Sequence, residues 1–344
     1  MRFPVSLPEP DCLAPSAIPA LRWGVIGPGW IAERFVQSVQ RFTNQKIMGI
    51  ESRDGARAAA FARRFDIPHS FDGAMSADPR IDALYIATPH PFHFEMARRA
   101  IEAGKPVLVE KPLCVSAAEA RELVELARAR HVFLMEAYWT DFLPKFSVLR
   151  KVLAEGLIGE IVTVMADHGE FFPPEHRIMR ADLGGGPMLD LGTYVIGLAT
   201  GILGRPDQVM AHSTRAESGV DGQTGMLFQY RGGAQAVLHT SLLSHTPCGA
   251  VIAGREGMIT LAGKFYTPGP FVLSANDPSR TLTFDEPRSA YDGLHFQVEH
   301  MAWCLGQGMT QSPIRPLSAS LLALETMDRA RAAGHATRAD APFA

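Results

Sequence analysis

The stretch Leu21-Arg22-Trp23-Gly24-Val25-Ile26-Gly27-Pro28-Gly29-Trp30-Ile31-Ala32 decides the fold of this chain. Its apolar first half is typical of a buried strand, and its second half fits the pattern G-x-G-x-x-G/A at the start of a helix. In such a turn Gly27 permits the tight bend, and Gly29 lets the backbone approach a pyrophosphate. The first helical residues, Trp30 and Ile31, would present backbone N–H groups to that anion. The stretch therefore predicts a dinucleotide-binding unit rather than a chance glycine turn.

Further along the chain, apolar runs alternate with helical patterns up to residue 137. Strands separated by crossover helices predict a parallel, doubly wound sheet with right-handed connections. Gly104 is a good end for one helix, and the capping box Ser116-Ala117-Ala118-Glu119 opens the next. We therefore expect a Rossmann domain of the α/β class over residues 21–137. The expected strands are 21–26, 47–50, 83–87, 107–109 and 132–135, and the expected helices are 31–42, 56–65, 92–103 and 116–130.

Residues 138–344 have a different texture, with short alternating runs separated by glycine turns such as Arg231-Gly232-Gly233. This pattern predicts an α+β domain with a mostly antiparallel sheet. The expected strands are 161–166, 208–214, 225–230, 234–242, 249–253, 258–261 and 271–274, and the expected helices are 183–203, 295–305 and 319–332.

The first twenty residues contain five prolines and no apolar core of a signal peptide. They are expected to form a disordered, proline-rich tail. The alternative is an extended arm that embraces a neighbouring subunit.

Composition excludes several classes of protein. The net charge of -3 gives no basic field, which argues against nucleic acid and anionic membrane as partners. No apolar run approaches the length of a membrane span. The four cysteines lie far apart without metal-binding spacing, which fits a reducing cytoplasm and no metal site.

Lys111 is placed unusually, at the end of the run Val107-Leu108-Val109-Glu110-Lys111-Pro112. Lysine is rarely buried without a partner, and ligands of open α/β sheets bind at the carboxyl ends of the strands. Lys111 is therefore expected to face a ligand. The alternative is a strand-end lysine that extends its ammonium to water.

The second strand bears on the coenzyme. NAD sites usually place an acidic residue roughly 20 positions past the glycines, to bond the ribose 2′-OH. Here Glu51 is followed by Ser52 and Arg53, with Arg57 one helical turn further. A hydroxyl and two guanidiniums suit a 2′-phosphate, so NADP is favoured. NAD stays possible if Glu51 points toward the ribose, and the two arginines could also be a solvated helix start.

Two further segments carry polar residues. Thr88-Pro89-His90 and His93 follow the third expected strand, where they could line the nicotinamide or start the next helix; the prolines and the lack of a third ligand argue against a metal. Asp190 and Tyr194 are spaced i, i+4 and share one face of an otherwise apolar helix. They are candidates for chemistry, the alternative being a buried tyrosine with a capping aspartate.

By these motifs the chain resembles the Gfo/Idh/MocA oxidoreductases. The resemblance runs from about residue 23 to about residue 330 and rests on the glycine turn, on Thr88-Pro89 with His93, on Glu110-Lys111-Pro112 and on the glycine-rich segment before Asp190. It implies a Rossmann domain followed by a domain with an open sheet, and a homodimer formed through that sheet. The implied cofactor site comprises Gly27, Gly29, Trp30, Ile31, Ser52, Arg53, Arg57, Thr88, Pro89, His90, His93, Glu110 and Lys111.

Tyr194 stands where most members of that family have histidine. In this respect the chain resembles the branch of dimeric dihydrodiol dehydrogenases and NADP-dependent pentose dehydrogenases. The resemblance implies a catalytic pair, Lys111 and Tyr194, with Asp190 and Trp139 in the substrate pocket. His168 stands where that branch tends to have an aromatic residue, which favours a more polar substrate than an aromatic diol. Further candidates for the pocket are Phe171, Phe172, His176 and Arg177.

The predicted activity is hydride transfer between NADP and a secondary alcohol of a sugar or cyclic diol. Tyr194 would take the hydroxyl proton, and the Lys111 ammonium would favour the phenolate. Asp190 would orient Lys111 or hold a second hydroxyl of the substrate. Two alternatives stay open: a non-catalytic protein that senses NADP and a metabolite, and an NAD-dependent glycosidase on the same fold.

Overall fold

The computed structural model describes residues 3–286 and 293–336, which form two compact units. The parallel-sheet unit contains residues 12–142 and 293–320, and the antiparallel-sheet unit contains residues 3–11, 143–286 and 321–336. The division predicted at residue 138 differs from the contacts, which place residues 138–142 and 293–320 with the parallel sheet. The helix near residue 300 belongs with the parallel sheet, because it packs on the first helix of that unit.

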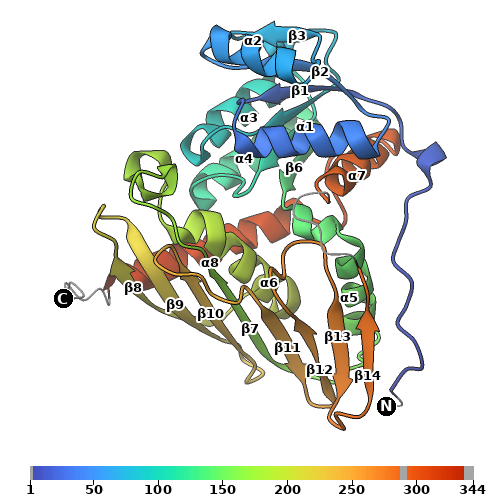
Figure 1. Cartoon of the computed structure of the whole chain (residues 1–344), viewed down its shortest axis with the longest axis vertical. Coiled ribbons are helices and arrows are strands. Elements are labelled where there is room, and N and C mark those ends of the chain that lie inside the picture. Colours follow the sequence, from blue (N-terminus) through green and yellow to red (C-terminus); the bar gives the residue numbers. More distant parts are fainter. Residues whose placement is uncertain (1–2, 287–292, 337–344) are drawn as a thin grey trace. The chain divides into compact units, whose positions relative to one another are not determined.

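The parallel-sheet unit has the predicted doubly wound topology (Figure 1). Its strands are ordered β3-β2-β1-β4-β5-β6, and every neighbouring pair is parallel. The edge strand β3 was not predicted, because three residues are too few to show a periodic pattern. The strands are β1 (Arg22–Ile26), β2 (Lys46–Glu51), β3 (His69–Phe71), β4 (Ala83–Ile86), β5 (Val107–Glu110) and β6 (Leu134–Ala137).

Helices α2 and α4 of this unit begin at residues whose side chains cap them. Asp54 accepts hydrogen bonds from two N–H groups of α2, and Ser116 accepts one from Glu119 in α4. Phe35 of α1 stacks on Tyr85 of β4, with ring centroids 3.7 Å apart, and anchors the core. The helices are α1 (Trp30–Phe42), α2 (Gly55–Arg64), α3 (His93–Glu102), α4 (Ala117–Arg130) and α7 (His295–Gly306), with short 3₁₀ turns at Pro15–Ala17, Met75–Ala77, His90–Phe92 and Trp139–Phe142.

The antiparallel-sheet unit contains an eight-stranded sheet in the order β14-β13-β12-β11-β7-β10-β9-β8 (Figure 1). Only the central pair β7 and β10 is parallel among these described neighbours. The predicted α/β chain with a mostly antiparallel second sheet is thus confirmed. The strands are β7 (Ile161–Gly169), β8 (Gln208–Arg215), β9 (Asp221–Gln229), β10 (Gln235–Ser241), β11 (Ala250–Gly254), β12 (Gly257–Leu261), β13 (Phe271–Ala275) and the unpredicted β14 (Thr281–Phe284).

Helix α6 covers one face of this sheet, against β7 and β10. The predicted helix 183–203 is shorter than expected, because Gly184 and Gly186 adopt positive φ angles of 69° and 101°. The segment Ala181–Leu203 is long and apolar enough to cross a membrane, but 78% of its most apolar window is buried inside the fold, as in a core helix. The helices are α5 (Pro144–Ala154), which was not predicted, α6 (Thr193–Leu203) and α8 (Leu317–Ala336), with 3₁₀ turns at Arg177–Met179 and Ala181–Leu183 and a π-helical turn at Met188–Gly192.

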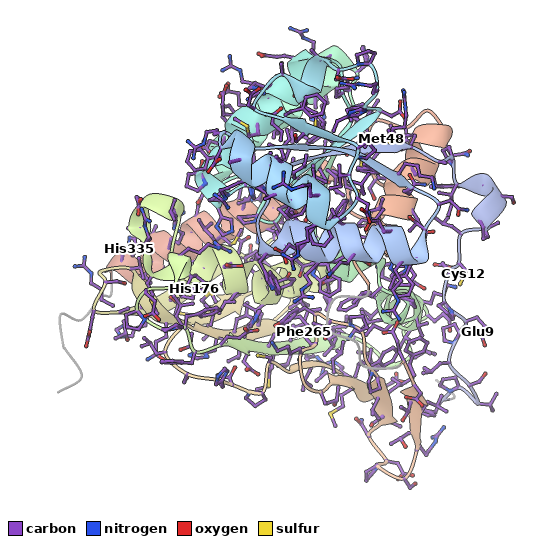
Figure 2. The ribbon with its side chains drawn as sticks, turned by 45° about the horizontal axis from the view of Figure 1, so that its top comes forward. Glu9, Cys12, Met48, His176, Phe265 and His335 are labelled. Carbon is purple, nitrogen blue, oxygen red and sulfur yellow. The ribbon has the colours of Figure 1, made fainter. Side chains whose placement is uncertain are left out.

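The described part of the N-terminal segment lies along its own chain. Asp11 forms an ion pair of 2.6 Å with Lys151 of α5, and its backbone N–H donates to Ser147 Oγ. The carbonyl oxygen of Glu9, labelled in Figure 2, accepts a hydrogen bond from the same lysine. Residues 3–11 therefore lie along α5 of the same unit, which supplies partners for their polar groups.

Candidate active site

The glycine turn after β1 has the geometry that a dinucleotide site requires. Gly27 has a φ of 102°, and a Cβ at this position would lie 2.7 Å from the carbonyl oxygen of Ala87, so only glycine fits. Gly29 is the N-cap of α1 and has no side chain that could cap the first turn. A helix start without a side-chain cap is the arrangement that suits an anion, because backbone N–H groups point along the helix axis there.

Thr88 adds a second observation at the same edge of the sheet. Its Oγ1 atom is buried and has no hydrogen-bond partner within the described part of the chain. Buried hydroxyls normally have partners, so this one fits a polar group of a bound ligand. With Gly27, Gly29 and the start of α1, Thr88 would hold the pyrophosphate and neighbouring groups of a dinucleotide, whose nicotinamide accepts or donates hydride.

At the end of β2 the side chain of Glu51 is buried, whereas those of its basic neighbours are exposed. Glu51 is only 4% exposed, and its carboxylate accepts hydrogen bonds from Met75 N (2.9 Å) and Arg99 Nη2 (3.2 Å). Arg53 and Arg57 are exposed, and the Arg53 guanidinium lies 4.9 Å from the ring centroid of Phe92. Both oxygens of Glu51 are therefore used inside the fold, while the two guanidiniums face outward.

His90 and His93 start the next helical segment, which was one of the two predicted possibilities. The ring of His93 is fully buried, with Nε2 2.9 Å from the carbonyl oxygen of Thr88 and Nδ1 2.8 Å from that of Pro112. His93 therefore joins the segment after β4 to the segment after β5. Both of its ring nitrogens lie against backbone carbonyl oxygens of the protein.

The turn that carries Lys111 is held by several groups. The Lys111–Pro112 peptide bond is cis, and the Lys111 N–H donates to Glu110 Oε2 (3.2 Å). The other oxygen of Glu110 accepts a hydrogen bond from the hydroxyl of Tyr85. Glu110, predicted to bind the cofactor, is thus buried and serves to fix the backbone of Lys111. Lys111 itself is half-buried at the carboxyl end of β5, as predicted.

A buried ion pair supports this turn from β6. Glu136 accepts hydrogen bonds from the N–H of Leu113 (3.0 Å), from Arg315 and from the hydroxyl of Ser320. Burial alone would lower the pKa of Arg315, but Glu136 and Asp141 raise it above its ordinary value. Trp139, predicted in the substrate pocket, is buried in the 3₁₀ turn that follows β6.

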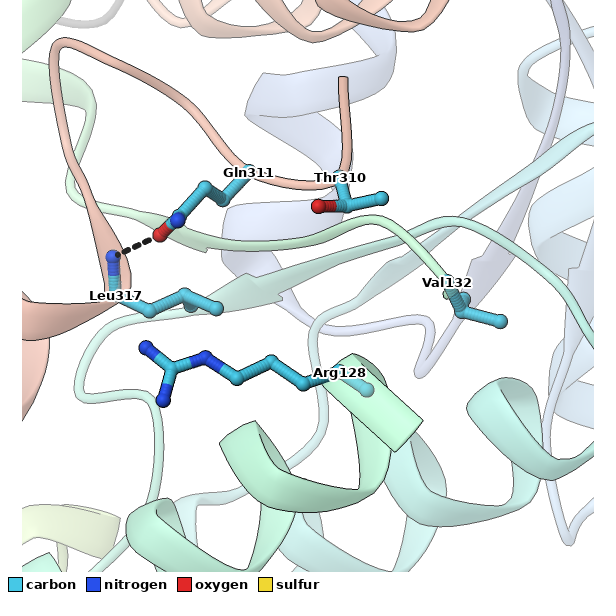
Figure 3. A pocket seen from close by; sticks show the side chains of 6 residues that line it. Arg128, Val132, Thr310, Gln311 and Leu317 are labelled. Atoms are coloured by element: carbon cyan, nitrogen blue, oxygen red, sulfur yellow. Dashed lines mark hydrogen bonds between the residues drawn. The ribbon is translucent and has the colours of Figure 1, made fainter. Parts of the chain in front are cut away.

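A small hollow in the same unit, shown in Figure 3, does not extend the site. It encloses about 10 Å³, which suffices for one water molecule. The side chain of Gln311 accepts a hydrogen bond from the Leu317 N–H across it. The lining residues are Ala127, Arg128, Val132, Thr310, Gln311 and Leu317.

In the antiparallel-sheet unit, Tyr194 belongs to a buried cluster of three rings. The ring of Tyr194 stacks on Tyr266, with centroids 4.4 Å apart, and lies 5.5 Å from that of His168. His168 in turn stacks on Tyr266 at 4.3 Å. The cluster fixes the orientation of the Tyr194 phenol between the sheet and α6.

Glu170 organises this cluster through one oxygen. Its Oε1 atom lies 3.2 Å from His168 Nε2, 2.8 Å from the hydroxyl of Tyr266 and 2.9 Å from Lys264 Nζ. The hydrogen bond from His168, with those from Lys264 and Tyr266, holds the pKa of Glu170 well below its usual range although burial opposes the shift. Burial and the Glu170 charge raise the pKa of Tyr266. Tyr266 therefore stays a neutral hydrogen-bond donor, and His168 is held inside the fold.

Asp190 lies in the π-helical turn directly before α6, and its Oδ2 atom is 3.2 Å from Arg177 Nη2. Such π-turns occur frequently at functional sites. Burial and the neighbouring Arg177 lower the pKa of His176. The ring of Phe172 lies against His176, while Phe171 is exposed. This unit therefore brings predicted residues together in three contacts: His168 with Tyr194, Phe172 with His176, and Arg177 with Asp190.

Four residues near the site were not predicted from the sequence: Arg99, Glu170, Tyr266 and Arg315. Arg99, Tyr266 and Arg315 act on partners far away in the sequence, so no local pattern marks them. Glu170 gave a local signal, because it is an acid two positions after His168 at the end of a strand.

Two family models match the chain. "Oxidoreductase family, NAD-binding Rossmann fold" matches residues 21–138, and "GFO/IDH/MocA C-terminal domain" matches residues 146–260. The chain belongs to the Gfo/Idh/MocA oxidoreductase family.

Curated relatives of this Gfo/Idh/MocA oxidoreductase are trans-1,2-dihydrobenzene-1,2-diol dehydrogenases. The mouse enzyme is 35% identical over 323 residues, and the human enzyme is 32% identical; each match covers 91% of this chain and 97% of the relative. A solved 3-ketoreductase from Actinomadura kijaniata, in complex with NADP and TDP-benzene, is 27% identical with a TM-score of 0.81, covering 92% of this chain and 98% of that one.

A levoglucosan dehydrogenase in complex with NADH and levoglucosan has a TM-score of 0.82 over 93% of this chain and 98% of its own. At 20% identity it shows the shared fold alone. The predicted family and the NAD(P) cofactor are confirmed, and this Gfo/Idh/MocA protein is an NAD(P)-dependent oxidoreductase.

Proposed function

We propose that the protein transfers hydride between NADP and a secondary alcohol of a sugar or cyclic diol, with Tyr194 and Lys111 as the proton-transfer pair. The observation that carries this proposal is the buried ring cluster around Tyr194, in which Tyr266 and His168 hold the phenol in one orientation. The neighbouring phenol, Tyr266, donates its hydrogen bond to Glu170. We assign Tyr194 as the proton acceptor.

The substrate class follows from the relatives and from the polar residues of the antiparallel-sheet unit. Relatives are named for a vicinal diol and for a ketone reduction. Asp190 supplies a carboxylate four positions before Tyr194. In this proposal the carboxylate accepts a hydrogen bond from a second hydroxyl of the sugar or diol. His168 is hydrogen-bonded to Glu170, and its ring lies against that of Tyr194. In this proposal His168 therefore orients the tyrosines and does not bind the substrate.

In the proposed reaction Tyr194 accepts the proton of the substrate hydroxyl while hydride leaves the same carbon. A free phenol has a pKa near ~10, which is too high for an efficient base at neutral pH. The ammonium of Lys111 favours the phenolate and stabilises the oxygen as the carbonyl forms. Glu110, Glu136 and His93 hold the Lys111 backbone in place for this role. Solved forms of the related ketoreductase include a lysine-to-alanine and a tyrosine-to-phenylalanine variant, which supports testing this pair.

The test is a turnover assay with D-xylose, D-glucose and trans-cyclohexane-1,2-diol, read from the absorbance of the reduced nicotinamide. Tyr194→Phe and Lys111→Met are expected to lower kcat by at least about 10²-fold, with the Kd for NADPH unchanged. Tyr230→Phe is the matched control, since this buried phenol has no hydrogen-bond partner among the described residues. Full turnover by Tyr194→Phe would overturn the assignment.

Two other outcomes would replace the proposal. Release of an aglycone from a glycoside without net reduction of the cofactor would identify the NAD-dependent glycosidase reaction. Binding of NADPH without turnover of any alcohol in the panel would identify a sensor.

We also propose that NADP is the preferred coenzyme. The support is the arrangement at the end of β2, where Ser52, Arg53 and Arg57 are accessible and Glu51 is turned inward. Guanidiniums bind a phosphate bidentately, whereas an NAD site needs the acid for the ribose. Arg57→Met is expected to weaken NADPH about tenfold and leave NADH binding unchanged. An equal effect on both coenzymes would contradict the preference.

We further propose a homodimer formed through the open face of the eight-stranded sheet. A row of apolar side chains crosses five neighbouring strands in register: Met210, Leu227, Val237, Met165 and Val251. Met165, Met210 and Val237 are 48%, 43% and 44% exposed, and a continuous apolar face of this kind is normally covered. Val237→Glu is expected to convert the dimer to a monomer in light scattering, while Val237→Thr stays dimeric; a monomeric parent protein would refute the proposal.

A further inference from the structure

The carboxylate of Glu51 adjoins the proposed 2′-phosphate site, yet the fold neutralises it. Glu51 is the last residue of β2, and Ser52 and Arg53 follow it directly. Its Oε1 atom accepts a hydrogen bond from Arg99 on α3, and its Oε2 atom accepts one from the Met75 N–H. The pair is asymmetric: the Glu51 side chain is 5% exposed and that of Arg99 is 36% exposed.

The charge of Arg99 matters because the negative charge of Glu51, if left uncompensated, would disfavour an anionic ligand. An unpaired carboxylate at this position would repel a 2′-phosphate, which carries nearly two negative charges, more than it would affect a neutral ribose 2′-hydroxyl. The Met75 N–H orients Glu51 but brings no net charge. Arg99 alone, among the described partners of this carboxylate, supplies the compensating charge.

We infer that Arg99 is a positioning residue for coenzyme specificity: it holds Glu51 inward and neutralises it, and so permits NADP to bind beside Arg53 and Arg57. Arg99 does this without touching the coenzyme, through Glu51. The inference rests on the proposed preference for NADP. Arg99 would enforce this preference from outside the coenzyme site.

The experiment measures the Kd of NADPH and of NADH from the quenching of tryptophan fluorescence in the full chain. Arg99→Met is expected to weaken NADPH about five- to tenfold, the size of a typical electrostatic coupling, and to change NADH by less than about twofold. The double variant Glu51→Gln with Arg99→Met is expected to restore NADPH binding, because the uncompensated charge is then gone. Arg99→Lys keeps the charge and is expected to bind NADPH nearly as the parent protein does.

Arg98→Met is the matched control. Arg98 is the neighbouring residue on α3 and pairs with Glu102 on the surface, so its loss is expected to leave both coenzymes unaffected. If Arg99→Met weakens NADPH and NADH equally, or the double variant fails to recover NADPH, Arg99 has a merely structural role and the inference is overturned. If Arg99→Met does not fold, Arg99→Lys and the double variant still decide. A parent protein that binds NADH as tightly as NADPH would instead refute the proposed preference itself.

Discussion

Replacement of Arg315 by methionine is expected to destabilise the parallel-sheet unit by about 3–5 kcal/mol, because it leaves a buried carboxylate without its charge partner. Arg315 and Glu136 are only 3% and 2% exposed, so solvent does not replace the lost partner. The same carboxylate holds the Leu113 N–H, two residues after Lys111. The substitution is therefore expected to loosen the Lys111 turn as well.

The magnitude follows from the contacts that are lost. Arg315 donates to Glu136 through Nε (3.1 Å) and Nη2 (2.8 Å), and to Asp141 through Nη1 (3.3 Å). Hydrogen bonds to charged groups contribute about 1.5–3 kcal/mol each, and the cation over the Tyr138 ring, at 4.2 Å, adds on the order of 1–2 kcal/mol. The N–H of Leu113 and the hydroxyl of Ser320 continue to serve Glu136, and the guanidinium no longer has to be desolvated, so the net loss is smaller than the sum.

The assay is urea unfolding followed by tryptophan fluorescence. All four tryptophans lie in the parallel-sheet unit, so the signal reports this unit alone: Trp23, Trp30, Trp139 and Trp303. The matched control is the double variant Glu136→Gln with Arg315→Met, which removes both charges and is expected to recover all but about 1–2 kcal/mol. A loss below about 1 kcal/mol for Arg315→Met, or a double variant no more stable than the single one, would refute the reasoning.

Three further outcomes are expected. Gly27→Ala forces a Cβ to within 2.7 Å of the Ala87 carbonyl at a positive φ, so it is expected to cost about 2–4 kcal/mol of stability and to abolish NADPH binding; a stable variant with normal affinity would contradict the turn geometry. Thr88→Val removes a buried hydroxyl that has no partner in the described protein, so thermal stability is expected to hold or rise while the Kd for NADPH increases, and an unchanged Kd would exclude Thr88 from the site. Glu170 has a pKa held below its ordinary value of 4.5, so it contributes stability above that pH and loses it as the pH falls; the difference in melting temperature between the parent and Glu170→Gln is expected to shrink from pH 7 to pH 3, and a constant difference would contradict the network.

Local chemistry made much of the fold predictable. The glycine turn at residues 27–32, the cap at Ser116 and the alternation of apolar runs each depend on neighbours in the sequence, and each appears in the structure where it was expected. The strands β3 and β14 were missed because they are too brief to show a periodic pattern. Helix α5 was missed although Phe146, Leu149 and Val152 are apolar at helical spacing. The helix predicted from residue 183 begins later, because two glycines adopt positive φ angles.

The sequence by itself determined the family, the dinucleotide turn, and Lys111 and Tyr194 as the residues to examine, because these depend on residue type and short spacing. Only the tertiary structure decided what each polar group is used for. It turned Glu51 toward Arg99, fixed Glu110 under the Lys111 turn, buried His93 between two carbonyls and committed Tyr266 to Glu170. The physical reason is that a charged or hydrogen-bonding side chain is defined by its partners, and here those partners come from distant parts of the chain.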